Sequence, residues 1–248
     1  MFYWRSRIPP IDGRWVEAGF TSRAPGRGAG PYVGLNLGGH VGDDAELVQQ
    51  NRELVAASLG LPPERLVFLN QVHGSEVVEV SGPWQRPVPE ADGVVSTATE
   101  LGLAVLVADC VPVLLHDVQR GVVGAVHAGR PGLLRGVVPR AVEAMRALGA
   151  ERVAAIVGPS VCGRCYEVPA ELVERARSVA PSSVATSWSG TPAIDVAAGV
   201  AEQLTHLDVM VERVGGCTRE DEDLYSYRRH QTTGRFAGVI VLHGRGDR

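Results

Sequence analysis

Apolar positions along the chain recur with two spacings, one typical of helices and the other of strands. In residues 43–60 (DDAELVQQNRELVAASLG) apolar side chains stand three or four positions apart, as on one face of a helix. Asp43 or Asp44 can cap the start of this helix, and Gly60 can end it. Further helices are expected in the second half of the chain, over residues 132–148, 169–180 and 195–206.

Shorter runs of apolar and β-branched residues predict the strands. They lie at residues 65–71, 76–80, 103–109, 111–117, 121–127, 154–158, 209–214 and 238–242. Strands outnumber helices, and neighbouring strands are often separated by only a short turn, as in hairpins. This favours a mixed β-sheet within an α/β fold over a doubly wound parallel sheet. Two Pro/Gly-rich stretches, 23–32 and 81–92, are expected to be surface loops and not domain linkers.

The composition is that of an ordinary globular protein, with 45% apolar and 21% charged residues among 248. The net charge of −4 favours neither a nucleic acid nor an anionic membrane as partner. All 24 basic residues are arginine, which excludes a Schiff-base lysine, a Walker-type lysine and a lysine general base. A phosphate site in this chain must therefore use arginine, backbone N–H groups or a metal.

The chain shows no targeting or membrane signal. The aromatic run at the start, before Arg5, is too short for the core of a signal peptide, and the longest apolar stretch is interrupted by Asp109. Four cysteines without an export signal are typical of reduced thiols rather than of a disulfide framework. We therefore expect a cytoplasmic protein.

The strands 111–117 and 121–127 predict a hairpin that brings two reactive side chains together. If Val118 and Gln119 form the turn, Cys110 lies opposite His127, and other turns move the register by only two or three residues. Directly opposed Cβ atoms lie about 4.5–5.5 Å apart, close enough to share a metal or a proton.

A cysteine and a histidine at this distance allow three interpretations. A thiolate and an imidazole are ligands that Zn²⁺ prefers. They also form a nucleophilic pair, in which the histidine lowers the pKa of the thiol. The third interpretation is a buried free cysteine beside an unrelated histidine. The neighbouring Asp109 favours a functional site.

Other candidates are weaker when taken alone. His73 lies in a tight turn, where a histidine is most often a solvated side chain. The CGRC motif at 162–165 has no second C-x-x-C to complete a zinc knuckle, so we expect a structural turn with incidental thiols. The stretch 225–235 (YSYRRHQTTGR) can hold a phosphate or a carboxylate, although a solvated basic face balancing the acidic residues 220–223 is the simpler interpretation.

Several short motifs occur together in a recognisable order. They are NQVHG (70–74), ADGVVST (91–97), ADCVPVLL (108–115), HAG (127–129), GP–C–CYEV within 158–168, CT (217–218) and SYRR–TGR within 226–235, preceded by GLNLGGHVGDD and Asn51-Arg52. Together they resemble the YfiH family, also called the polyphenol-oxidase or "laccase" domain family. The resemblance covers residues 15–243, nearly the whole chain.

The resemblance implies one α/β domain over residues 1–248, with helices outside mixed β-sheets in α/β/β/α layers. It also implies that His73, Cys110 and His127 bind one zinc ion. Family members are described as purine nucleoside phosphorylases that also deaminate adenosine and split methylthioadenosine. The multicopper laccase description fits poorly, because seven scattered histidines without an H-x-H pair do not suit a blue-copper and trinuclear system.

One loop departs from the family pattern. The usual HAGWRG is HAGRPG here, so that Arg130 replaces a tryptophan and Pro131 replaces an arginine. A role of that arginine toward phosphate or substrate could pass to Arg130 or be lost. Pro131 suits the first turn of a helix.

With these residues, the resemblance to the YfiH family implies a zinc-dependent purine nucleoside enzyme. It would split adenosine, inosine or methylthioadenosine with phosphate to a base and ribose 1-phosphate, and it would deaminate adenosine. Zinc is expected rather than copper. Asp109 is assigned proton transfer, and Arg130 and Arg229 are assigned phosphate positioning. The substrate-binding residues are expected to be Asn36, Gln71 and Arg229.

Two alternatives belong to other classes. One is a hydrolase with Cys110 as nucleophile and His127 as base, acting on a peptide amide or muropeptide in the editing of peptidoglycan precursors. The other is a metal-binding module whose altered loop has lost catalysis.

Overall fold

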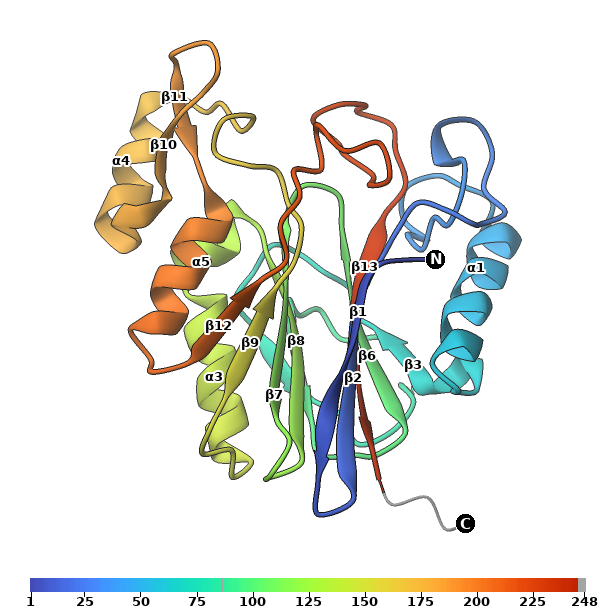
Figure 1. Cartoon of the computed structure of the whole chain (residues 1–248). Helices are drawn as coiled ribbons and strands as arrows, with labels where there is room; N and C mark the ends of the chain where they lie inside the picture. The colour runs from blue at the N-terminus through green and yellow to red at the C-terminus, as the bar shows by residue number, and fades with distance from the viewer. Residues whose placement is uncertain (86, 245–248) are drawn as a thin grey trace.

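Two β-sheets pack face to face in the middle of the molecule, and helices cover their outer sides (Figure 1). The computed structural model describes residues 1–85 and 87–244. The larger sheet has the order β12 (Met210–Arg213), β9 (Ala154–Val157), β7 (Val111–Asp117), β8 (Val122–Ala128), β5 (Gly93–Ser96) and β4 (Val77–Glu79). The smaller has the order β1 (Phe2–Ile11), β2 (Arg14–Thr21), β13 (Phe236–His243), β6 (Leu101–Val107) and β3 (Leu66–Phe68).

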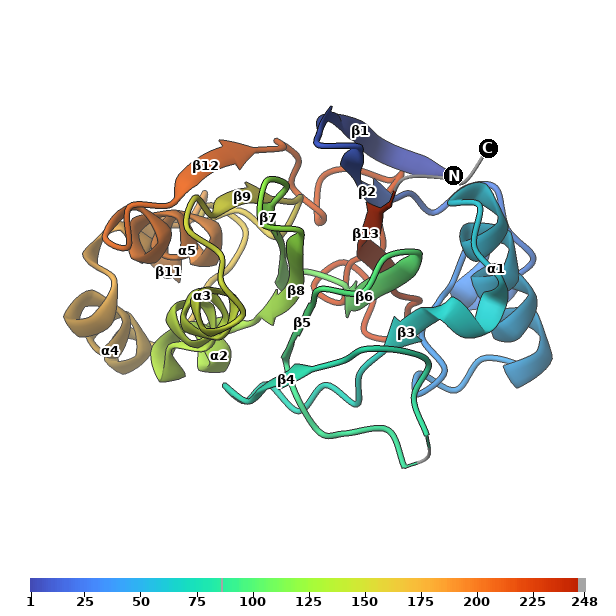
Figure 2. The ribbon, with the colours of Figure 1, turned by 90° about the horizontal axis from the view of Figure 1, so that it is seen from below.

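The helices are divided unequally between the two sides, as Figure 2 shows. On the outer side of the six-stranded sheet lie α2 (Arg130–Arg135), α3 (Val137–Ala147), α4 (Ala170–Val179) and α5 (Val196–Thr205). On the outer side of the five-stranded sheet lies α1 (Ala45–Ser58). Short 3₁₀ helices (Gly30–Tyr32, Pro63–Arg65, Pro181–Ser183) and the small hairpin of β10 (Val184–Thr186) and β11 (Pro192–Ile194) complete the elements.

The core between the sheets is apolar from both sides. Phe20, Leu103 and Ile240 of the smaller sheet are fully buried in one cluster with Leu114 and Val123 of the larger sheet. Burying each such side chain contributes about 1.5–3 kcal/mol. The expected α/β fold with α/β/β/α layers is confirmed, and both sheets mix parallel and antiparallel pairs.

The helix predicted over 43–60 is α1, and Asp44 caps it by accepting hydrogen bonds from the N–H groups of Glu46 and Leu47. The helix predicted over 132–148 is instead two helices. Gly136, with φ of +76°, adopts the left-handed conformation that ends α2 and begins α3. Pro131 lies in the first turn of α2, as predicted.

The hairpin of β7 and β8 exists, but its register differs by two residues from the one predicted. His127 pairs with Pro112, and the connection between the strands spans four residues, 118–121, rather than two. Cys110 therefore lies just before the first paired residue of β7 and does not face His127 across the ladder. It lies instead next to Gly129.

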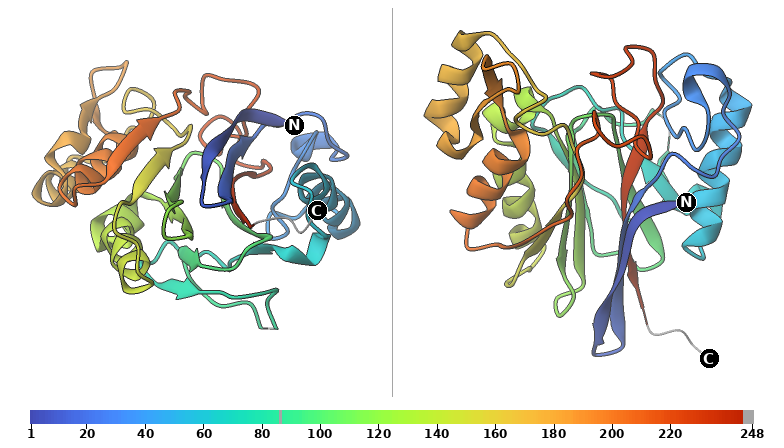
Figure 3. Two further views of the ribbon diagram at one scale, coloured as in Figure 1. Left: turned by 60° about the horizontal axis from the view of Figure 1, so that its bottom comes forward. Right: turned by 45° about the horizontal axis from the view of Figure 1, so that its top comes forward.

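Two predicted strands that are neighbours in sequence lie in different sheets. β3, within 65–71, runs parallel to β6, whereas β4, within 76–80, runs parallel to β5. The turn that contains His73 is thus the crossing from one sheet to the other and not a hairpin turn (Figure 3).

The pattern predicted no strand in the first 21 residues, where the structure has β1 and β2. β1 is an edge strand with two prolines and no fully buried residue, so it lacks a clear apolar alternation. Among the described residues, no helix has the length and apolar character needed to cross a membrane.

Candidate active site

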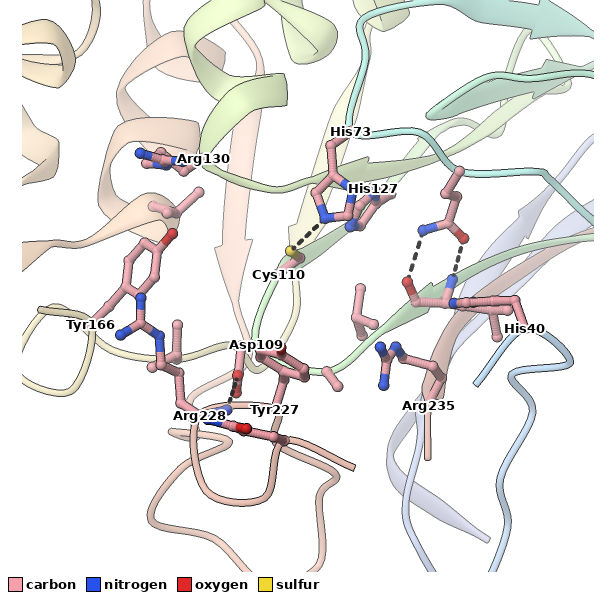
Figure 4. A pocket seen from close by; sticks show the side chains of 17 residues that line it. His40, His73, Asp109, Cys110, His127, Arg130, Tyr166, Tyr227, Arg228 and Arg235 are labelled. Atoms are coloured by element: carbon pink, nitrogen blue, oxygen red, sulfur yellow. Dashed lines mark hydrogen bonds between the residues drawn. The ribbon is translucent and has the colours of Figure 1, made fainter. Parts of the chain in front are cut away.

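Three side chains from three separate segments meet at one end of the hairpin of β7 and β8. The Nε2 atom of His73 lies 3.7 Å from the Sγ atom of Cys110, and the ring centroids of His73 and His127 are 4.7 Å apart. The candidate ligand atoms of the three residues all lie within 4.8 Å of one another (Figure 4). We refer to His73, Cys110 and His127 as the HCH cluster.

Asp92 orients one ring of the HCH cluster. Its Oδ1 atom lies 2.7 Å from the Nδ1 atom of His127, and both side chains are buried. Because Nδ1 is used in this way, Nε2 is the nitrogen of His127 that is available to a metal. A carboxylate behind a ligating histidine is the usual outer partner in zinc sites.

The same carboxylate also holds the turn that carries His73. The N–H groups of Val72, His73 and Gly74 donate hydrogen bonds of 3.2, 3.0 and 2.6 Å to it. His73 has a φ of +56°, a conformation that costs energy for a residue with a side chain, and these bonds stabilise it. Asp92 thus positions two of the three ligands.

Asp92 was absent from the residues predicted for the site. The sequence did hold a signal for it, since Asp92 directly precedes the apolar strand of the ADGVVST motif. A buried carboxylate at such a position needs hydrogen-bond donors, which indicates a structural or functional role.

Electrostatics favour a thiolate in the HCH cluster. Burial raises the pKa of Cys110, but the charge of His127 and hydrogen bonds from both histidines lower it to about 6. Burial lowers the pKa of His127, but Cys110 and Asp92 raise it to about 9. Without a metal, these shifts favour a thiolate beside an imidazolium, and a thiolate is both a metal ligand and a nucleophile.

Gly129 leaves room for the HCH cluster. A Cβ atom on Gly129 would lie 2.9 Å from Cδ2 of His73, closer than real Cβ contacts, and 3.0 Å from Sγ of Cys110, which is unusually tight. The first glycine after His127 is therefore required by the packing of the ligands.

A cavity of about 580 Å³ opens beside the HCH cluster. This volume is typical of a site for a small organic ligand. Besides the cluster, its polar and aromatic wall consists of His40, Gln71, Asp109, Arg130, Tyr166, Tyr227, Arg228, Gln231 and Arg235 (Figure 4). The described wall thus combines a candidate metal centre with several cationic side chains.

Gln71, predicted to bind substrate, lies on this wall. Its amide donates to the carbonyl of Leu106 and accepts from the N–H of the same residue, both at 2.8 Å. These two bonds hold the amide against β6.

Asp109, predicted to transfer a proton, also lies on the wall, but its carboxylate is engaged within the protein. It accepts hydrogen bonds of 2.7 Å from Thr218 Oγ1, 2.6 Å from Ser226 Oγ and 2.6 Å from the N–H of Arg228. Its φ of +90° is unusual for a residue with a side chain. Asp109 thus ties two other segments, around Thr218 and around Ser226–Arg228, to the position before Cys110, and its part in proton transfer stays a prediction.

Arg130 lies on the wall at the start of α2. Its Nε atom is buried and has no hydrogen-bond partner among the described residues. Arg130 is only partly buried, and a guanidinium on a cavity wall is suited to an anion.

Asn36 and Arg229, both predicted to bind substrate, are not on the wall of the cavity. The guanidinium of Arg229 donates to the carbonyls of Thr218, Arg219, Asp221 and Leu224. The fully buried amide of Asn36 accepts a 2.8 Å hydrogen bond from the N–H of Arg235. Both residues hold loops in place.

His40 is a wall residue that the sequence interpretation did not assign, whereas Arg228 and Arg235 belong to the stretch 225–235 that it considered for a phosphate or carboxylate. Burial lowers the pKa of His40, and the nearby Arg235 and Arg52 lower it further. In the sequence, His40 ends the segment GGH (38–40) and Arg235 ends the segment TGR (233–235). Neither segment has a residue spacing that by itself indicates a binding site.

The fold and the HCH cluster define a mixed α/β protein with a cysteine–histidine cluster that could hold a metal ion. Residues 17–243 match the family model described as multi-copper polyphenol oxidoreductase laccase. The chain belongs to this family, which includes the YfiH proteins.

Relatives and solved structures agree with this assignment. A Streptomyces coelicolor protein named purine nucleoside phosphorylase is 55% identical over 228 residues, which are 90% of this chain and 94% of the relative. A Streptomyces griseus protein of the same name is 52% identical, covering 95% of this chain and 98% of its own. The structure of YlmD from Geobacillus stearothermophilus superposes with a TM-score of 0.84 at 30% identity, covering 95% of this chain and 94% of YlmD.

Proposed function

We propose that the protein is a zinc-dependent purine nucleoside phosphorylase. It would split adenosine and inosine with phosphate to the base and ribose 1-phosphate, and methylthioadenosine to adenine and the methylthio-substituted ribose 1-phosphate, and it would also deaminate adenosine. The observation that carries the proposal is one cavity with the HCH cluster and three cationic wall residues, Arg130, Arg228 and Arg235. The printed names of the relatives support the same activity.

The residues of the HCH cluster fit zinc. Two imidazoles and a thiolate are nitrogen and sulfur ligands, and three protein ligands are typical of catalytic zinc sites. Asp92 supplies the outer hydrogen bond to His127, and Gly129 leaves the space. When bound, zinc supplies a Lewis acid that polarises a ligand and lowers the pKa of water.

The chain's own residues would bind and orient the reactants. With no lysine in the protein, phosphate binding falls to arginine, and Arg130 and Arg235 are the candidates with access to the cavity. In this proposal Arg235 takes the place of Arg229, and Asn36 acts on substrate only by positioning Arg235. Tyr166 and Tyr227 offer aromatic surfaces for a purine, and Asp109 is the candidate for proton transfer.

The experiment incubates purified, zinc-loaded protein with each nucleoside, with and without phosphate, and separates the products by chromatography. We expect free base and the sugar 1-phosphate (methylthio-substituted when methylthioadenosine is the substrate) only when phosphate is present, and inosine from adenosine in either case. The Cys110→Ser variant serves as the control and should form neither product. Zinc-loaded protein that forms none of these products would contradict the proposal.

A second candidate is a cysteine hydrolase, favoured by the arrangement of Cys110, His127 and Asp92. The 2.7 Å contact between His127 and Asp92 resembles the orienting pair of a nucleophile–base–acid triad. Stoichiometric metal that protects Cys110 from alkylation in the purified protein would exclude it. Nucleoside binding without turnover would instead point to a metal-binding module that has lost catalysis.

A further inference from the structure

A second group of candidate ligands lies outside the HCH cluster. Cys162 and Cys165 belong to the turn after β9, and Cys217 and Glu220 belong to the turn after β12. One ligand atom of each residue lies within 4.8 Å of those of all the others. We refer to these four residues as the CCCE cluster. Because β9 and β12 are parallel neighbours, their carboxyl ends bring the two turns together.

The two turns have the same hydrogen bond. The N–H of Cys165 donates to the carbonyl of Cys162 at 2.9 Å, and the N–H of Glu220 donates to the carbonyl of Cys217 at 3.0 Å. Each turn therefore presents its first and fourth side chains on one side, as in the C-x-x-C half of a zinc knuckle. The chain holds C-x-x-C and C-x-x-E, so a search for two C-x-x-C motifs overlooks the pair.

Hydrogen bonds within the CCCE cluster hold its candidate ligand atoms close to one another. The N–H of Cys162 donates to Sγ of Cys217 at 3.4 Å, and Sγ of Cys165 lies 3.0 Å from Oε1 of Glu220. All four cysteines of the chain are free thiols.

Groups around the CCCE cluster orient and partly neutralise it. The Nε1–H of Trp188 donates to Glu220 at 3.1 Å, as an outer partner does for a ligating carboxylate. Arg164 lies over the ring of Trp188, and Arg219 donates to the carbonyl of Cys165. Two arginines thus flank a site whose four ligands bring four negative charges.

We propose that Cys162, Cys165, Cys217 and Glu220 bind one zinc ion with a structural role. Three thiolates and a carboxylate complete a closed four-coordinate set, which is typical of structural rather than catalytic zinc. Thiolate-rich sites select zinc or iron over magnesium and calcium, and zinc needs no redox partner. This inference does not depend on the proposed function.

The position of the CCCE cluster explains what the metal would stabilise. Val161, just before the first turn, donates its N–H to the carbonyl of Asp109 at 3.0 Å, and Thr218, inside the second turn, donates to the Asp109 carboxylate. Tyr166, just after Cys165, stacks under the guanidinium of Arg228 on the cavity wall. The zinc would therefore join the two loops that hold one wall of the cavity.

The test uses the Cys110→Ser variant of the full chain, in which the CCCE cluster holds the only cysteines. Zinc is measured by elemental analysis after gel filtration, and cobalt replaces it for spectroscopy. We expect about one zinc per chain and a sulfur-to-cobalt charge-transfer band. Failure of the nucleoside reactions would leave this result unaffected. Absence of the band while the three thiols are reduced, or a disulfide among them found by mass spectrometry, would overturn the proposal.

A matched pair of substitutions in the same background tests the carboxylate ligand. Glu220→Gln should weaken zinc binding at least tenfold in a chelator competition, on the order of the loss for disturbed metal sites. Glu222→Gln removes the same charge from an exposed side chain two residues away and should change the affinity less than twofold. Equal effects of the two substitutions would show that Glu220 acts only through its charge and would overturn the assignment.

Discussion

The Oδ1 atom of Asp92 lies 2.7 Å from the Nδ1 atom of His127, and the same carboxylate accepts the backbone N–H groups of the turn around His73. Burial raises the pKa of Asp92, but the hydrogen bonds from His127 and from the turn lower it below its ordinary value. A single carboxylate thus couples two candidate metal ligands, His73 and His127, that are 54 positions apart in the sequence.

The Asp92→Asn variant should bind zinc at the HCH cluster about 10–100-fold more weakly, because loss of an outer hydrogen bond releases the orientation of a ligating histidine. Zinc affinity is measured by chelator competition. Asp117→Asn is the matched control, since Asp117 is a buried carboxylate that also accepts backbone N–H groups but lies outside the cavity wall. Unchanged affinity in Asp92→Asn would show that Asp92 does not position His127.

The Gly129→Ala variant should lose about tenfold in zinc affinity at the HCH cluster. The new methyl group overlaps His73 and Cys110, and relieving such a contact costs about 1–3 kcal/mol. Gly82→Ala is the control, because a Cβ atom there meets nothing within 4 Å. If both variants bind zinc like the wild type, the close approach at Gly129 has no functional consequence.

Substitutions of Arg130 and Arg229 should have different effects, one on phosphate binding and the other on the free energy of unfolding. Arg229→Gln removes a guanidinium that donates to four carbonyls, so the free energy of unfolding should fall by about 2–4 kcal/mol. Arg130→Gln should keep its stability, because the buried Nε atom has no partner among the described residues, but should raise the KM for phosphate about tenfold or more. Denaturant unfolding and phosphorolysis kinetics measure the two effects. A loss of stability in Arg130→Gln together with a raised KM for phosphate in Arg229→Gln would contradict the roles assigned to both residues.

The pKa of Cys110 predicts how metal-free protein reacts with iodoacetamide. Alkylation of Cys110 should reach half of its maximal rate near pH 6 and level off above about pH 7, because the thiolate fraction is then complete. The tryptic peptide that ends at Arg120 contains no other cysteine, so mass spectrometry follows this residue alone.

His127→Ala should move the midpoint of that profile to higher pH, since the cation that stabilises the thiolate is gone. An alkylation rate in the wild type that keeps rising through pH 8.5, as for an ordinary thiol, would contradict the thiolate–imidazolium pair.

The local pattern of apolar and polar residues was sufficient to predict most helices and strands and part of the candidate active site. The hairpin argument placed Cys110 near His127 with an error of two residues, because the length of a turn is not set by the strands that flank it. The motif resemblance supplied His73, whose turn was otherwise indistinguishable from a solvated one. Asp92 and His40 were overlooked, because their importance lies in what they contact across the fold.

The CCCE cluster likewise combines a motif that is visible in the sequence with partners that only the fold brings near. The C-x-x-C at 162–165 was visible in the sequence, and taken alone it predicted only a turn. Its partners, Cys217 and Glu220, become recognisable once β9 and β12 lie side by side.

By itself, the sequence determined the types and approximate bounds of most helices and strands, the absence of lysine chemistry and the closeness of Cys110 to His127. These properties depend on residues a few positions apart, where backbone geometry dictates which side chains are neighbours. The tertiary structure alone decided which distant segments meet, namely Asp92 with His127, Asp109 with Thr218 and Ser226, and the two turns of the CCCE cluster. Those contacts follow from the order of strands in two packed sheets, which no local spacing encodes.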